Sequence, residues 1–251
     1  MMDALRVLFV AVVGYLCGSI SFARIVTRIF APQEDITRTE LQSPGSDEIV
    51  MASFVSATTV SMHLGTRLGF LTVVLDMLKL VIPTVVFRLV WEGEPYFLLT
   101  SVMGMVGHIW PVYYGFQGGR GLSAVYGAMF AIDWIGVFAT SIGGLLLCLF
   151  VFRDVLVAYM GGLWLLIPWL WFRTHDLWHL AYAIAVNVIF GVAMIPEMTQ
   201  YLKLKREGKG ADLSQAMQTT GMGRGIYKMA RRFGAIRDTP RQDSQEVEGA
   251  Q

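Results

Sequence analysis

The chain has 251 residues, of which 55% are hydrophobic and only 16% are charged. Soluble domains carry about 25% charged residues, so this composition excludes an ordinary soluble protein and indicates a membrane protein. The formal net charge of +1 gives no bulk attraction for nucleic acid or for a strongly acidic partner. We therefore expect an all-α polytopic membrane helix bundle with no nucleic-acid partner.

Neither cysteine suggests a disulfide or a metal-binding framework. Cys17 and Cys148 lie in apolar runs, and neither belongs to a CxxC or Cys/His pattern. We therefore expect no metal and no cofactor. The first apolar run lacks a preceding basic region and a small-residue cleavage pattern, so it is interpreted as a membrane-spanning helix and not as a signal peptide.

The first third of the chain contains two predicted spans. About 20 apolar helical residues cross a bilayer, which predicts a first span over residues 5–29, followed by a polar loop over residues 31–47. Residues 48–64 are only moderately apolar and are interpreted as an interfacial or re-entrant helix. Residues 68–91 form the next span, which Pro83 should kink.

The remaining spans follow closely on one another. Residues 96–116 form the third span, whereas residues 122–152 are too long for one span and are divided near Asp133 into a short helix and a full one. Residues 155–172 and 177–195 complete about seven membrane segments.

The composition changes abruptly after the last span. We therefore divide the chain into a membrane domain over residues 1–200 and a basic tail over residues 201–251. The excess of lysine and arginine places the tail in the cytoplasm, and an odd number of spans then places the N-terminus outside the inner (plasma) membrane. The segment GMGRGIYKMARRFG, residues 221–234, is either a basic amphipathic segment on an anionic membrane surface or a solvated stretch.

A glycine-rich loop precedes the predicted short helix. The sequence GHIWPVYYGFQGGRG, residues 107–121, ends in Gly118, Gly119, Arg120 and Gly121. Glycines let backbone N–H groups approach an anion, a helix N-terminus attracts phosphate, and arginine adds a fork of donors. The alternative is a tight turn whose arginine extends to lipid headgroups. The favoured ligand is a phosphate or acyl-phosphate at the membrane surface.

Two ionisable residues lie inside a predicted span. Asp76 and Lys79 are three positions apart, so they are candidates for a functional site in the bundle interior or for a structural ion pair between adjacent turns. Both interpretations remain open from the sequence.

The histidines are weaker candidates. His108 lies at the end of a predicted span and is interpreted as a packing residue or a catalytic base. His175 and His179 have the i, i+4 spacing of metal ligands, but no third ligand is nearby, which favours an aromatic and histidine belt at the outer face. Neither a G-x-S-x-G elbow, nor H-E-x-x-H, nor a Walker loop, nor the His-x₄-Asp acyltransferase pattern is present.

Three blocks of the sequence resemble the bacterial acyl-phosphate:glycerol-3-phosphate acyltransferases. GYLCGSISFARIV is similar to the first helix of that family, and GFLTVVLDMLKL is similar to its LLDxxKG span. GHIWPVYYGFQGGRGLSAVYG is similar to its GHxxPVxxGFKGGKGVATxxG motif, with Arg120 in the usual lysine position. The resemblance implies a seven-helix inner-membrane enzyme of phospholipid biosynthesis.

The implied substrates are acyl-phosphate and glycerol 3-phosphate, with membrane lipids as surroundings. Transfer of a fatty acyl group from acyl-phosphate to the 1-hydroxyl needs no protein nucleophile, because the donor is already activated and positioning and electrostatics can supply the rate. By this resemblance the glycine loop and Arg120 hold phosphate, Asp76 and Lys79 organise the site from beneath, and His108 belongs to the substrate-binding set. Ser19, Thr58 and Thr59 are candidates for contacts to glycerol phosphate.

Two other family motifs are altered. An ungapped match to GSGNxGATNVxR puts Thr59 in place of the asparagine and Met62 in place of the arginine, with His63 or Arg67 as possible replacements for the lost cation. The third motif has a histidine and, three residues later, an asparagine. Glu197 and the basic run after it are its only match here, and the family serines before the sixth helix are replaced by Arg153, Asp154 and Val155.

These losses leave two alternatives to an active enzyme. The first is a catalytically inactive homologue that binds lipid phosphate or scaffolds other lipid enzymes. The second is a small transporter that uses Asp76 and Lys79 as a relay, although the sequence has neither an internal repeat nor paired broken helices.

Overall fold

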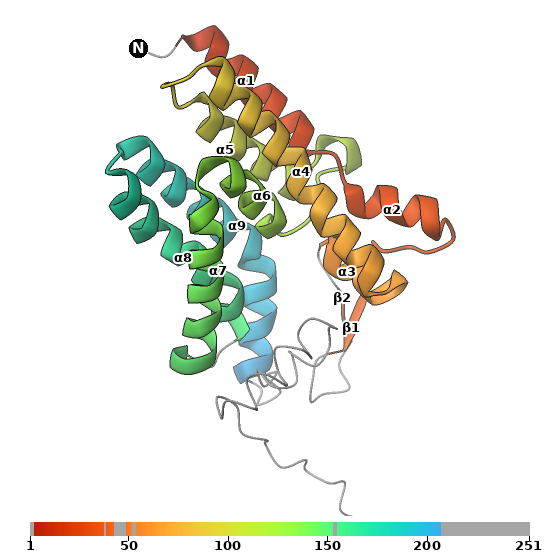
Figure 1. Cartoon of the computed structure of the whole chain (residues 1–251). Coiled ribbons are helices and arrows are strands. Elements are labelled where there is room, and N and C mark those ends of the chain that lie inside the picture. The colour runs from red at the N-terminus through yellow and green to blue at the C-terminus, as the bar shows by residue number, and fades with distance from the viewer. Residues whose placement is uncertain (1–2, 38, 43–48, 52–53, 153–154, 207–251) are drawn as a thin grey trace, which may run out of the picture.

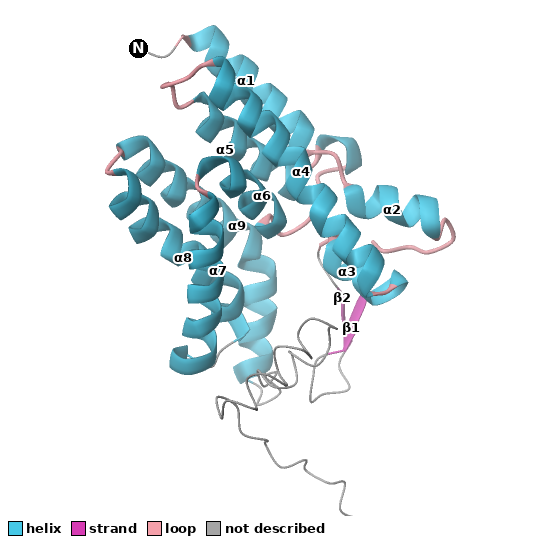
Figure 2. Cartoon of the chain, in the orientation of Figure 1, coloured by secondary structure: helices cyan, strands magenta, loops and turns pink. Residues whose placement is uncertain are grey.

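The computed structural model describes residues 3–37, 39–42, 49–51, 54–152 and 155–206 (Figure 1). The described part is a helical bundle with one small hairpin (Figure 2). Its helices are α1 (Ala4–Gly18), α2 (Phe22–Phe30), α3 (Ala57–Leu64), α4 (Thr66–Val90), α5 (Tyr96–Ile109), α6 (Leu122–Ile132), α7 (Trp134–Leu146), α8 (Val155–Thr174) and α9 (Leu177–Arg206). A short π-helical stretch, Leu147–Phe152, continues α7.

Several described helices can cross a bilayer. Four stretches of the described chain are long and apolar enough: Ala4–Phe30, Thr66–Val90, Trp134–Phe152 and Leu177–Thr199. The protein is therefore an all-α integral membrane protein with several passes, as predicted. The exception to the helical pattern is an antiparallel pair, β1 (Glu40–Gln42) and β2 (Ile49–Met51), in which Glu40 lies opposite Met51. The sequence predicted a loop and the start of a helix there, and both were wrong at these residues.

The first predicted span is not one continuous helix. Helix α1 ends at Gly18, and α2 begins at Phe22 after Ser21 takes an extended conformation. Figure 1 shows α2 leaving the direction of α1 at this break. Helix α2 buries Ala23, Val26 and Thr27, whereas Arg28, Ile29 and Phe30 at its end are exposed. The span predicted over residues 5–29 therefore lies within one stretch that is long and apolar enough to cross a bilayer, Ala4–Phe30. The structure divides this stretch into two helices, and the second, α2, is amphipathic.

Close packing of α1 on α5 depends on glycines. A Cβ atom at Gly14 would overlap the backbone of Thr100, and one at Gly18 would overlap the backbone of Gly104. Helices in membranes commonly approach through small residues spaced four apart, because lipid supplies no hydrophobic force between them. This contact fixes the end of α1 against the end of α5, where the glycine-rich loop begins.

Two other helix boundaries bear on the predictions. Helix α5 ends at Ile109, because the residue before Pro111 is disfavoured in a helix, so the predicted extension to residue 116 was wrong. A one-turn 3₁₀ helix, η1 (Val112–Tyr114), follows. Helix α4 runs through Pro83 as one helix from Thr66 to Val90.

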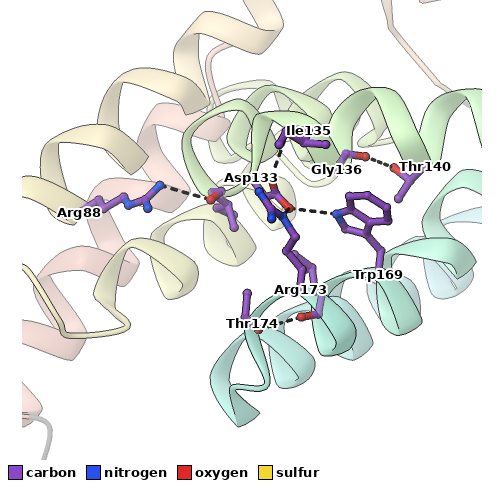
Figure 3. A network of polar contacts seen from close by, with 10 residues as sticks. Arg88, Asp133, Ile135, Gly136, Thr140, Trp169, Arg173 and Thr174 are labelled. Atoms are coloured by element: carbon purple, nitrogen blue, oxygen red, sulfur yellow. Dashed lines mark hydrogen bonds and ion pairs between the residues drawn. The ribbon is translucent and has the colours of Figure 1, made fainter.

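The predicted break at Asp133 is confirmed, and a polar network surrounds it (Figure 3). The Asp133 carboxylate caps α7 by accepting from the Ile135 N–H at 3.2 Å. It also accepts from Trp169 Nε1 at 2.9 Å and from Arg173 Nε at 3.3 Å, both on α8. Arg88 of α4 donates to the carbonyls of Ala131 and Ile132 at the end of α6. Arginine thus neutralises the carbonyl end of one helix while aspartate caps the next.

Asp133→Ala is expected to lower the free energy of unfolding by about 1–3 kcal/mol, because it removes the cap of α7 and leaves Trp169 Nε1 without its acceptor. Asp133→Asn keeps an acceptor for the Ile135 N–H and is expected to lose less. Thermal unfolding in detergent with a fixed lipid content measures both variants. Equal melting temperatures for the wild type and Asp133→Ala would contradict the role of this network.

Candidate active site

The glycine-rich loop lies between α5 and α6, at the bundle end where α1 stops and α2 and α3 begin (Figure 1). Gly115 and Phe116 adopt positive φ angles of 60° and 62°, and Gly121 has φ of 94° as the residue that precedes α6. The N–H of Gly119 donates to the carbonyl of His108 at 3.0 Å. The loop therefore folds back onto the last turn of α5 and delivers the chain to the N-terminus of α6.

Segments far away in the sequence hold this loop. The Gly118 carbonyl accepts from the Val55 N–H at 2.8 Å, just before α3. The Gln117 carbonyl accepts from Arg24 Nη1 of α2 at 2.7 Å, and the Arg24 guanidinium carbon lies 4.7 Å from the centre of the Tyr114 ring. The sequence did not indicate that Arg24 contacts the loop. Contacts from α2, from α5 and from Val55 just before α3 thus hold the loop in one conformation.

Asp76, Lys79 and His108 form one buried cluster beneath the loop. They are 2%, 7% and 6% exposed, respectively. Lys79 Nζ lies 2.9 Å from Asp76 Oδ1, 2.9 Å from His108 Nδ1 and 2.6 Å from the Ile20 carbonyl. The sequence left open whether Asp76 and Lys79 form an ion pair or a functional site. The structure shows the ion pair and connects it to His108 and to the break after α1.

The His108 ring lies between this cluster and the loop, with Nδ1 near Lys79 and Nε2 near Gly119. A Cβ atom added to Gly119 would overlap His108 Nε2 and would lie 3.2 Å from Cδ2 and from Cε1. The Nε2 edge of the ring therefore faces the backbone of Gly119. The absence of a side chain at Gly119 is what allows the loop and the ring to approach so closely.

Arg120 is paired within the protein. Its Nη2 lies 2.9 Å from Glu197 Oε2, and its Nε donates to both oxygens of that carboxylate at 3.0 and 3.2 Å. Its guanidinium carbon lies 3.6 Å from the centre of the Phe54 ring. The two charged side chains are only 14% and 19% exposed. A phosphate that binds Arg120 must share the guanidinium with Glu197 or displace it.

Glu197 was not among the predicted site residues, although its position in α9 matches the family's third motif. The match to that motif was the one indication in the sequence that Glu197 matters. The match could not show that Glu197 pairs with Arg120, 77 positions away. Phe54, which stacks on the same guanidinium, had no signal in the sequence because a single phenylalanine in an apolar chain is uninformative.

Two of the three hydroxyl candidates, Ser19 and Thr59, make hydrogen bonds within the local structure. Ser19 is fully buried and donates to the Tyr15 carbonyl at 2.8 Å. Thr59 is also fully buried; its hydroxyl donates to the Ser56 carbonyl at 2.7 Å and accepts the Ser56 N–H at 3.0 Å, which closes the capping box of α3. Thr58 lies in the same first turn of α3, partly exposed, and its N–H donates to Ser56 Oγ at 3.2 Å. The first turn of α3 comes directly after Val55, the residue whose N–H contacts Gly118.

His63 and Arg67 were considered as replacements for the family arginine. The structure gives these two residues different surroundings. His63 Nε2 lies 3.1 Å from Thr39 Oγ1, and His63 Nδ1 lies 3.4 Å from Glu34 Oε2. Met62 and Arg67 are exposed. His63 therefore joins α3 to the segment that follows α2, and its ring nitrogens are both engaged there.

His175 and His179 lie where α8 passes into α9, at the bundle end away from the glycine loop (Figure 1). His179 Nδ1 contacts Asp176 Oδ2 at 2.6 Å, and the His175 ring lies edge-on to Trp171 with centres 6.0 Å apart. No group of three or more potential metal ligands occurs among the residues that the structure describes. Arg153, Asp154 and the segment 221–234 lie outside the described residues.

Solved structures share this fold. The crystal structure of PlsY (YgiH), an integral membrane glycerol 3-phosphate acyltransferase, in its lysophosphatidic acid form superposes with a TM-score of 0.65 at 23% identity, covering 82% of this chain and 94% of that one. Its glycerol 3-phosphate form gives the same TM-score and coverage at 24% identity.

Sequence relatives carry the same description. The glycerol-3-phosphate acyltransferase of Aquifex aeolicus is 29% identical over 145 residues, which are 53% of this chain and 69% of that protein. Those of Francisella tularensis subsp. novicida and Legionella pneumophila are each 31% identical, over 50% and 51% of this chain. The matches span only 56% and 42% of those two relatives. The family model "Glycerol-3-phosphate acyltransferase" matches residues 8–203, which is most of the chain, and the protein therefore belongs to the glycerol-3-phosphate acyltransferase family.

Proposed function

We propose that this protein is a membrane acyltransferase of phospholipid biosynthesis that moves a fatty acyl group from acyl-phosphate to glycerol 3-phosphate. The observation that carries the proposal is the glycine loop at the N-terminus of α6, seated on the buried cluster of Asp76, Lys79 and His108, in a chain that belongs to this family. In the reaction, the 1-hydroxyl oxygen bonds to the acyl carbon and the bond from that carbon to phosphate breaks. Phosphate leaves, and the hydroxyl proton is released.

The site supplies positioning and charge rather than a nucleophile. Gly118, Gly119 and Gly121 bring backbone close to a bound phosphate, and the first N–H groups of α6 have no side-chain cap to compete with it. Arg120 adds positive charge at the same loop. Asp76 and Lys79 act from beneath by fixing the end of α1 and the His108 ring.

The hydroxyl candidates have a smaller part in this proposal. Thr58, which is partly exposed in the first turn of α3, is the best placed of the three for glycerol phosphate. Ser19 and Thr59 contact substrate only if they give up the hydrogen bonds that they make to Tyr15 and Ser56.

We also propose the topology that this function requires. Helices α1, α4, α5, α6, α7, α8 and α9 form about seven membrane segments, and α2 and α3 lie at the cytoplasmic surface beside the glycine loop. Arg24, Arg28, Arg67 and Arg120 belong to that end, whereas Arg88 and Arg173 belong to the other, which supports a cytoplasmic site by the positive-inside rule. The N-terminus is then outside the inner membrane, and the chain divides into the membrane domain 1–200 and the cytoplasmic tail 201–251.

Two observations favour the alternative, an inactive homologue that binds lipid phosphate. The guanidinium of Arg120 is already engaged by Glu197, and Met62 stands exposed where the family has an arginine. A site with these two changes has less free positive charge for two phosphorylated substrates at once.

Acyl transfer by the purified protein distinguishes the two proposals. Palmitoyl phosphate and labelled glycerol 3-phosphate are supplied in detergent or lipid cubic phase, and labelled lysophosphatidate is followed against a heat-killed control. Product above the control is expected. No product from folded protein that still binds palmitoyl phosphate would favour the inactive homologue.

A further inference from the structure

The contacts of Lys79 determine the protonation of His108. The Lys79 ammonium has three N–H donors and no acceptor, and three groups surround it: the Ile20 carbonyl at 2.6 Å, Asp76 Oδ1 at 2.9 Å and His108 Nδ1 at 2.9 Å. The ammonium makes hydrogen bonds to the Ile20 carbonyl and to His108 Nδ1, and it pairs by charge with Asp76. An ammonium N–H can donate to Nδ1 only if Nδ1 carries no proton. The proton could instead lie on Nδ1 and be donated to Asp76. The distance of 3.8 Å between His108 Nδ1 and Asp76 Oδ1 is too long for that hydrogen bond.

A neutral imidazole has one N–H, so the proton of His108 lies on Nε2. A second proton on Nδ1 would face the Lys79 ammonium directly in a buried setting. The cluster is already neutral with one carboxylate and one ammonium, and an imidazolium would add an uncompensated charge. The cluster therefore holds His108 neutral and in a single tautomer.

The Nε2–H edge faces the glycine loop. It points at the backbone of Gly119, where a side chain would overlap it. Among the described residues, the one hydrogen bond of the His108 ring is that to Lys79 at Nδ1, so Nε2–H has no protein acceptor there although the residue is only 6% exposed. A donor that faces the loop and has no protein acceptor is available to a ligand or to water. The same loop leads into α6, whose first N–H groups have no side-chain cap.

We propose that Lys79 fixes His108 as the neutral Nε2–H tautomer, and that this N–H donates to a phosphate oxygen bound at the glycine loop. His108 then serves as a hydrogen-bond donor to substrate and not as the general base for the glycerol hydroxyl. Lys79 and Asp76 are positioning residues that act through it. This inference rests on the proposed function for the identity of the ligand, whereas the tautomer rests on the geometry alone.

Nitrogen NMR of the ¹⁵N-histidine-labelled full chain tests the tautomer without any ligand. The signal of His108 is identified by its loss in His108→Gln, and His175→Gln, at the other end of the bundle, serves as the matched control. We expect a protonated Nε2 and an unprotonated Nδ1 that do not change between about pH 6 and 9, and a mixed or titrating ring in Lys79→Met. A proton on Nδ1, or titration in the wild type, would overturn the proposal.

Phosphate affinity tests the donor role, with inorganic phosphate and glycerol 3-phosphate as probes in calorimetry. In His108→Gln, the amide oxygen replaces Nδ1 as the acceptor for Lys79 and the NH₂ group replaces Nε2–H, so affinity should stay within a few-fold of the wild type. His108→Leu should weaken it about tenfold to hundredfold, the range for a hydrogen bond to a charged group. Equal weakening by both variants would overturn the donor role.

The two proposals fail in different ways. If the wild type binds neither inorganic phosphate nor glycerol 3-phosphate, the donor role and the proposed function are both wrong, while the nitrogen signals still decide the tautomer. If the wild type binds phosphate and transfers acyl groups while His108 titrates, only the inference about His108 is wrong.

Discussion

Arg120→Ala is expected to lower kcat/KM for acyl transfer by about a hundredfold or more, while the protein remains folded. The substitution removes the forked donor from the glycine loop, and one preorganised donor to a developing oxyanion contributes about that much to rate. It also leaves the Glu197 carboxylate, only 19% exposed, without its ion-pair partner beside the phosphate site. Both effects disfavour a phosphorylated substrate. Initial rates with palmitoyl phosphate and glycerol 3-phosphate, together with melting temperature, measure the outcome.

Two further variants separate the effects at Arg120. Arg28→Ala, an exposed arginine of α2 at the same end of the bundle, is the control for loss of one positive charge and should stay close to the wild type. Arg120→Ala combined with Glu197→Gln should recover part of the lost activity, because the negative charge of Glu197, no longer paired with Arg120, is removed from beside the phosphate site. Unchanged turnover in folded Arg120→Ala would show that the guanidinium is only a structural partner of Glu197 and Phe54.

Gly119→Ala is expected to lower the rate of acyl transfer by about a hundredfold at a modest cost in stability. The new methyl group would overlap His108 Nε2 and lie 3.2 Å from Cδ2 and Cε1. The ring cannot retreat easily, because Lys79 holds its Nδ1 at 2.9 Å, so the loop must shift and the space for phosphate is filled. Overpacking of this kind costs about 1–3 kcal/mol in stability, whereas a displacement of about 1 Å at a reacting centre costs about a hundredfold in rate.

Gly115→Ala is the matched control in the same loop. Gly115 has φ of 60°, and nothing lies within 4 Å of a Cβ atom added there. The substitution therefore costs only backbone strain of about 1–2 kcal/mol and leaves the space beside His108 open. Rates and KM values for glycerol 3-phosphate should be close to wild type. Equal losses in Gly115→Ala and Gly119→Ala would mean that general loop strain, and not the space at His108, limits activity.

Much of the fold was readable from local patterns. The share of apolar residues and the lengths of apolar runs predicted a multi-pass helical protein, and the run over residues 122–152 was too long for one span, which located the break at Asp133 correctly. The glycine loop and the pair Asp76 and Lys79 were also found, because glycine clusters and buried charges are rare in apolar spans. The family resemblance, confirmed over residues 8–203, added the reaction class.

The errors occurred where a long-range contact overrides a local pattern. The span predicted over residues 5–29 continues through Ser19 and Ile20, yet α1 ends at Gly18. The Ile20 carbonyl accepts a hydrogen bond from Lys79, 59 positions away. The sequence also predicts Arg120 as a phosphate ligand, and only the structure shows that its guanidinium pairs with Glu197 on α9.

The sequence by itself determined that this protein is a helical membrane protein of the glycerol-3-phosphate acyltransferase family with a glycine loop before a short helix. These features depend on residue type and on spacing within one helix or loop. Only the tertiary structure decided which side chains meet: Lys79 with His108 beneath Gly119, and Arg120 with Glu197 and Phe54. Hydrogen bonds and ion pairs depend on distances of about 3 Å, and such distances between separate helices are set by how the helices pack.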